Sequence, residues 1–208
     1  MNPYFFTYKS FAVTWFVALS VIAIVISNIT VKYSAEKKGM NKSKIDDIFF
    51  ILLITGFAGA RLSYVLFNYN LFKDDLFSII KLSHMNLYLY GGILLGLVAL
   101  YILSKKNDIP YYDMFKVYVL PFYFSIAIGI WSVFFDGFLV GKKYNGIFSI
   151  KYLGAQRHPT VIYISILFLL GALIESINFR ESFSKKVSYT TFIIVILGYY
   201  VIRNFLAY

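Results

Sequence analysis

The sequence predicts an all-α polytopic membrane protein, a bundle of about six transmembrane helices with an outward-facing cavity that is accessible to lipid. Two features of the composition predict this class. Hydrophobic residues make up 60% of the 208 residues and charged residues only 14%, whereas about a quarter of the residues of an average soluble domain are charged. The third feature is that the apolar residues form continuous runs of about 20, the length that crosses a bilayer as a helix.

The apolar runs define the expected spans in order along the chain. They are continuously apolar and do not alternate, which favours helices over the strands of a membrane barrel. The first run has no small-residue cleavage site after it, so we expect a span and not a signal peptide. The predicted spans are residues 11–31, 46–68, 87–104, 115–139, 159–179 and 188–207. No linker or repeat divides the chain, so we expect a single transmembrane domain, 1–208.

Basic residues predict the orientation of these spans. Eleven Lys and Arg residues lie in the connections after the first, third and fifth spans, against eight on the other side. Cytoplasmic loops carry the excess of basic residues, so we expect both termini to face outward. The net charge of +10 then fits membrane topology and anionic headgroups and argues against nucleic acid as a partner, because the chain has no basic aromatic module. Cysteine is absent, which excludes disulfides, thiolate metal sites and a cysteine nucleophile.

On this topology, the residues that are unusual for a membrane span gather at the outer face. Arg61 lies in the outer half of the second span, within a stretch, LLITGFAGARLSYVLFNYN, that contains no acid. The others stand at the outer ends of later spans: Tyr90, Gly91, Gly92, Asp136, Arg157, His158 and Arg203. Cations near the outer leaflet at buried depth fit a site for the phosphate of a lipid headgroup.

Each of these residues also has a simpler explanation. Arg61 or Arg203 can extend to the headgroups as a snorkelling side chain, an acid can pair with nearby surface lysines, and a histidine before a proline often begins a helix. Paired glycines can serve close packing of helices, and tyrosines at span ends usually belong to the interfacial belt. A channel or transporter is disfavoured, because no chain of acids or amides crosses the midplane.

Five stretches carry a resemblance to a known family. They are GARLSYV (59–65), LYGGILLG (89–96), GIWSVFFDGFLVG (129–141), RHPTVIY (157–163) and GYYVIR (198–203). In order and spacing they resemble the prolipoprotein diacylglyceryl transferases of bacterial plasma membranes, over nearly the whole chain. The first is similar to the family's second span and RHPTVIY to its HPTQLYE stretch, and the other three stand where the family has HGGLIG, GRxGNFxNxExxG and YGxxRFxxE.

The resemblance implies a reaction at the outward face of a multi-pass protein of the bacterial plasma membrane. Diacylglyceryl passes from phosphatidylglycerol, or another anionic phospholipid, to the lipobox cysteine thiol in the signal peptide of a preprolipoprotein, with no metal and no cofactor. It implies three catalytic residues, of which His158 or Tyr90 handles the proton and Asp136 orients a partner. The implied substrate-binding residues are Arg61, Gly91, Gly92, Arg157, Tyr163 and Arg203.

The chain departs from the family pattern at several polar positions. Ile130, Val133 and Phe138 stand where the long signature has arginine, asparagine and glutamate. Tyr90 replaces a histidine, and Ala207 replaces the glutamate after the last arginine. The sequence also ends where the family usually adds another span. We therefore expect a divergent, shortened member, and a second hypothesis stays open: a non-catalytic descendant that binds phospholipid or a lipoprotein precursor.

Overall fold

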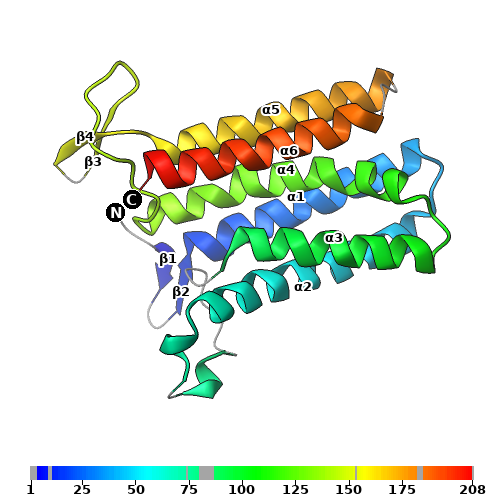
Figure 1. Cartoon of the computed structure of the whole chain (residues 1–208), viewed down its shortest axis with the longest axis horizontal. Helices are drawn as coiled ribbons and strands as arrows, with labels where there is room; N and C mark the ends of the chain where they lie inside the picture. The colour runs from blue at the N-terminus through cyan, green and yellow to red at the C-terminus, as the bar shows by residue number, and fades with distance from the viewer. Residues whose placement is uncertain are drawn as a thin grey trace. The chain divides into compact units, whose positions relative to one another are not determined.

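A computed structural model describes residues 4–8, 11–73, 75–79, 87–152, 154–181 and 185–207. Among these residues, six helices are long and apolar enough to cross a membrane, which confirms the predicted class of all-α polytopic membrane protein. Figure 1 shows them in chain order: α1 (Trp15–Lys37), α2 (Lys42–Phe67), α3 (Leu89–Lys106), α4 (Tyr111–Phe135), α5 (Thr160–Glu181) and α6 (Lys185–Val201).

Shorter elements stand between and beside these helices. Antiparallel hairpins form from β1 (Tyr4–Tyr8) with β2 (Phe11–Thr14) and from β3 (Ile150–Tyr152) with β4 (Ala155–Arg157). Two 3₁₀ turns, η1 (Tyr69–Leu71) and η2 (Leu76–Ile79), follow α2. A π-helical turn, η3 (Ile202–Leu206), ends α6.

Several predicted helix limits differ from the observed ones by four to six residues, and two of these differences have a clear local cause. The first span was expected from residue 11, but Phe11–Thr14 pairs as β2 with β1, and α1 begins at Trp15. The fourth was expected to run to residue 139, but α4 ends at Phe135. There Gly137 and Leu139 adopt positive φ angles of 79° and 53°, a conformation that no α-helix contains.

The described residues belong to two compact units. Unit 1 comprises Met1–Thr30 with Tyr118–Tyr208, and unit 2 comprises Val31–Val117. In unit 1, the start of α1 and the end of α6 lie at the same end (Figure 1), as two termini on one membrane face require. The assignment of residues 1–208 to one domain stays a prediction.

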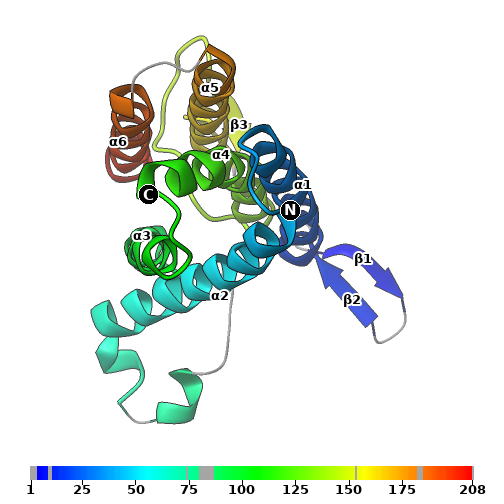
Figure 2. The same cartoon turned by 90° about the vertical axis from the view of Figure 1, so that its right-hand side faces the viewer.

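In unit 2, α2 and α3 lie side by side (Figures 1 and 2) and pack through glycines. A Cβ built on Gly59 falls 2.5 Å from the carbonyl oxygen of Gly91, and one built on Gly92 falls 2.9 Å from that of Gly56. Only glycine therefore allows the two backbones to approach this closely, as in other membrane helix pairs.

Replacing Gly91 with alanine is expected to lower the free energy of unfolding by about 1–3 kcal/mol. The new Cβ would lie 2.1 Å from Ser63 Oγ and 2.5 Å from the carbonyl oxygen of Gly59, so the helices must separate. Gly96→Ala is the matched control on the same helix, because a Cβ there meets nothing within 4 Å. Unfolding of both purified variants in the same detergent measures the difference, and equal stability of the two would contradict this packing.

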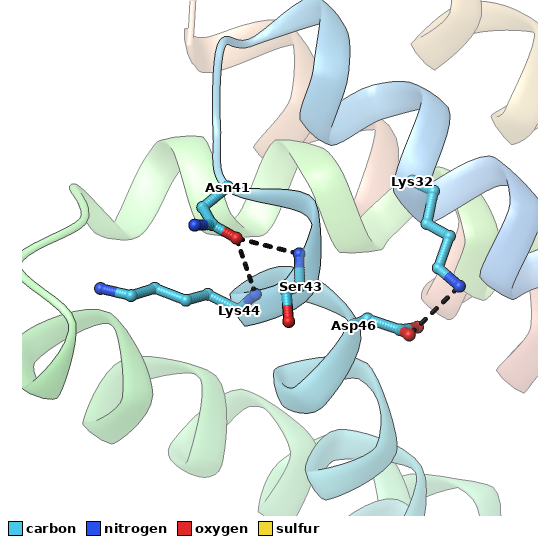
Figure 3. A network of polar contacts seen from close by, with 5 residues as sticks. All are labelled: Lys32, Asn41, Ser43, Lys44 and Asp46. Carbon is cyan, nitrogen blue, oxygen red and sulfur yellow. Dashed lines mark hydrogen bonds and ion pairs between the residues drawn. The ribbon is translucent and has the colours of Figure 1, made fainter.

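At the other end of unit 2, polar contacts hold the turn between α1 and α2 (Figure 3). Asn41 caps α2: its Oδ1 accepts hydrogen bonds from the backbone N–H of Ser43 at 3.0 Å and of Lys44 at 3.2 Å. Lys32 Nζ lies 3.1 Å from Asp46 Oδ2, which joins α1 to α2. A cap of this kind contributes about 1 kcal/mol, and a partly exposed ion pair less.

In unit 1, α5 packs beside α6 (Figure 2), and a polar cluster joins their connected ends. Asn178 Nδ2 donates to Ser188 Oγ at 2.7 Å, and Ser188 Oγ donates to Glu175 Oε2 at 2.9 Å. All three side chains are buried. Sequence reasoning passed over this cluster, although an acid inside an apolar run with an amide three residues later is a readable signal.

Candidate functional site

Arg61 of α2 is enclosed by protein in unit 2, with 6% of its surface exposed. Its Nε–H donates to the backbone carbonyl of Ile79 at 3.0 Å. The guanidinium carbon lies 5.2 Å from the ring centre of Phe72 and 5.9 Å from that of Tyr64, within the range of cation–π attraction. Arg61 therefore holds the segment after α2 against the helix, which is not the exposed arrangement of a snorkelling arginine.

The first turn of α3 lies beside the turn of α2 that carries Arg61. The backbone N–H of Tyr88 donates to the carbonyl of Ala60 at 2.9 Å, and Asn68 Nδ2 donates to Tyr88 Oη at 3.2 Å. Unit 2 thereby brings Tyr90 into the neighbourhood of Arg61. Gly91 and Gly92 face α2, which supports the helix-packing explanation for both. Their contact with a substrate stays a prediction.

In unit 1, the segment between α4 and α5, which we call the arm (136–159), carries or borders the other candidates. Its backbone pairs with itself, since Tyr144 N–H donates to the carbonyl of Gln156 at 2.9 Å. Lys142 contacts both the end of the arm and the turn after α6: its carbonyl accepts from His158 N–H at 3.1 Å, and its N–H donates to the carbonyl of Leu206 at 2.8 Å. The arm thus ties the start of α5 to the π-helical turn that contains Arg203.

His158 stands just before α5 and is held by an aromatic partner. Its ring stacks on Tyr144, with centroids 4.0 Å apart and planes 13° from parallel, and Tyr163 meets it edge-on at 6.1 Å. His158 Nδ1 is buried with no hydrogen-bond partner among the described residues. The stacking fixes the position of the ring, and a fixed position is one requirement of a general base.

Two glycines of the arm allow close contacts with His158 and Tyr144. A Cβ on Gly141 would lie 2.0 Å from the carbonyl oxygen of His158, and one on Gly146 would lie 1.9 Å from Tyr144 Oη. Leu139, at a positive φ, is held by the hydroxyl of Thr160, which donates to its carbonyl. Strained backbone of this kind gathers at functional sites.

The remaining candidates of unit 1 occupy the same end. Arg157 Nη1 donates to the carbonyl of Gly141 at 3.1 Å and its Nε to that of Tyr152 at 3.3 Å, so this arginine holds the arm together. Arg203 Nη1 donates to Tyr199 Oη at 3.4 Å. Asp136 directly follows α4, and its N–H donates to the carbonyl of Ser132. π-Helical turns such as the one around Arg203 are rare and frequent at functional sites.

The predicted site residues therefore form one group in each unit. Unit 2 holds Arg61, Tyr90, Gly91 and Gly92; unit 1 holds Asp136, Arg157, His158, Tyr163 and Arg203. The cavity expected to join them stays a prediction. The sequence analysis missed Tyr144, because its contact with His158 depends on how the arm folds. Within the described ranges, no three His, Cys, Asp or Glu side chains gather as a metal site would need.

Comparison with known proteins gives a consistent result. The sequence profile described as prolipoprotein diacylglyceryl transferase matches residues 3–208. The chain is similar to the phosphatidylglycerol–prolipoprotein diacylglyceryl transferase of Clostridium kluyveri, with 28% identity over 93% of this chain and 80% of that protein. It is similar to the proteins of the same name from Streptococcus suis, at 29% identity over 95% and 78%, and Clostridioides difficile, at 26% over 88% and 73%.

Proposed function

The chain belongs to the prolipoprotein diacylglyceryl transferase family, and we propose that it transfers diacylglyceryl from phosphatidylglycerol to the lipobox cysteine of preprolipoproteins. The match to the family over residues 3–208 carries this proposal. The names of the relatives support the same donor and acceptor. The protein acts in the bacterial plasma membrane, with the site directed outward.

The reaction forms one bond and breaks one. The cysteine sulfur attacks the glyceryl carbon that is esterified to phosphate, a thioether forms, and the carbon–oxygen bond breaks to release glycerol phosphate. The thiol proton must leave first or during attack, because a free thiol has a pKa of about 8.5 and is mostly protonated at neutral pH. The absence of cysteine from the chain is compatible with a nucleophile that the substrate supplies.

The candidate residues suit these steps in the following roles. Arg61 and Arg203 are the candidates for binding phosphate, where charge develops as the leaving group departs. His158, fixed by Tyr144, takes the thiol proton, or the phenol of Tyr90 does so. Asp136 orients a partner, and the other candidates for contact with substrate are Gly91, Gly92, Arg157 and Tyr163.

Purified protein in phosphatidylglycerol nanodiscs, given a lipobox peptide, is expected to release glycerol phosphate and to increase the peptide mass by one diacylglyceryl group. A peptide with serine in place of the lipobox cysteine is the matched control and should stay unmodified. Binding of phosphatidylglycerol with no release of glycerol phosphate, together with failure to restore lipidation in cells depleted of their own transferase, would identify a non-catalytic descendant.

A further inference from the structure

The arm carries a charge that its predicted position does not explain. The sequence has no acid between Asp136 and Glu175, and three lysines of this segment are exposed, Lys142, Lys143 and Lys151. Basic residues normally concentrate in cytoplasmic loops, whereas the arm lies on the face predicted to be outward. The predicted orientation of the chain in the membrane therefore does not explain why the arm contains these lysines.

The tip of the arm is apolar. Ile147 is 95% exposed and Phe148 71% exposed, the former more than any other large hydrophobic side chain among the described residues. In Figure 1 the loop between α4 and β3 extends beyond the start of α5 and away from the helices of unit 1. The bond from Ser149 N–H to the carbonyl of Gly146, at 3.0 Å, gives the tip a defined turn.

Two membrane-spanning helices fix the depth of the arm. α4 ends at Phe135 and α5 begins at Thr160, and both are long and apolar enough to cross the bilayer. The arm thus leaves and re-enters the same membrane face and lies at the level of the headgroups. A large aliphatic and an aromatic side chain flanked by lysines match the composition of segments that bind anionic membrane interfaces.

We propose that the arm docks on an anionic lipid surface. Ile147 and Phe148 enter the boundary between headgroups and acyl chains, and Lys142, Lys143 and Lys151 contact the phosphates. Charge complementarity favours lipid over the signal peptide of a precursor, because lysines attract the anionic headgroups. The docking does not depend on the transfer reaction, and it anchors the segment whose Tyr144 stacks on His158.

Because the chain has no cysteine, a single Ile147→Cys substitution allows a polarity-sensitive fluorophore to be placed at the tip. In nanodiscs with phosphatidylglycerol, this label is expected to shift to the blue and to lose most of its emission to brominated acyl chains. Asn145→Cys, an exposed polar position in the same loop, is the matched control and should stay in water. Replacing the three lysines with glutamine should return the tip label to the water spectrum, as should nanodiscs of phosphatidylcholine alone.

Three outcomes would overturn the proposal. If the tip label in phosphatidylglycerol nanodiscs is as accessible to water as the Asn145 control, the arm does not dock on lipid. Equal quenching in phosphatidylcholine nanodiscs removes the role of the lysines. Shielding that appears only when a lipobox peptide is added assigns the tip to the peptide. None of these measurements uses transfer activity, so they are separate from the test of the proposed function.

Discussion

Replacing Arg61 with lysine is expected to lower the rate of diacylglyceryl transfer by roughly 10²- to 10³-fold, the usual effect of removing one donor from a developing anion. Arginine presents a planar fork of donors, whereas lysine presents a single point charge. The Nε–H of Arg61 donates a hydrogen bond to the carbonyl of Ile79, and aromatic rings flank the guanidinium. Lysine keeps the positive charge but reproduces neither the Nε bond nor the fork.

Transfer rate and phosphatidylglycerol affinity in nanodiscs measure this effect, with Arg180→Lys as the matched control, because Arg180 belongs to the opposite predicted face. We expect both quantities to fall for Arg61→Lys and neither for Arg180→Lys. A purely structural Arg61 predicts a different pattern. The variant would then unfold at a lower temperature, since the Ile79 bond is lost, while its folded fraction would bind phosphatidylglycerol as well as the wild type does.

The helices were predictable because one physical constraint determines them. A span must be apolar over the thickness of the bilayer, so runs of apolar residues locate six helices whatever their neighbours are. The limits at residues 11–14 and 136–139 were not predictable in this way. They depend on pairing of β2 with β1 and on the positive φ angles of Gly137 and Leu139, which apolar composition does not encode.

The candidate site was predictable in part, for a similar reason. An arginine inside an apolar run, or a histidine at the start of one, is unusual by residue type alone, so Arg61 and His158 could be identified. Their partners could not. The conformation of the segment after α2 places the carbonyl of Ile79 beside Arg61, and the conformation of the arm places the ring of Tyr144 on His158. Such contacts depend on loop conformation and not on a local pattern.

The structure shows where some of the residues that depart from the family pattern lie in unit 1. Ile130 is buried in α4, whereas Phe138 is exposed just beyond the helix. Arg157 donates two hydrogen bonds to backbone carbonyls of the arm. Under the roles proposed for Arg61 and His158, the apolar residues at these family positions leave few other side chains to replace them, so single substitutions at Arg61 and His158 are expected to have large effects.

Replacing His158 with alanine is expected to lower the transfer rate by roughly 10²- to 10⁴-fold at pH 7, the usual contribution of a positioned general base. The loss should shrink as the pH rises above about 8.5, because the peptide thiol then ionises without help. Tyr144→Phe keeps the stacked ring and should transfer at a rate near that of the wild type. Tyr144→Ala removes the ring that holds the imidazole and should lower the transfer rate in part. Initial rates from pH 6.5 to 9.5 measure all three variants.

The pH profile separates this role from the two alternatives. α5 begins at Thr160, so His158 lies in the turn that leads into this helix. If His158 serves only that turn, then His158→Asn, a residue that turns favour, should restore both stability and rate, and any loss in His158→Ala should be the same at every pH. If the phenol of Tyr90 takes the proton, the loss that shrinks with rising pH should appear in Tyr90→Phe instead. Only a general base at His158 combines a pH-dependent loss in His158→Ala with no rescue by asparagine, because asparagine suits a turn but does not accept a thiol proton.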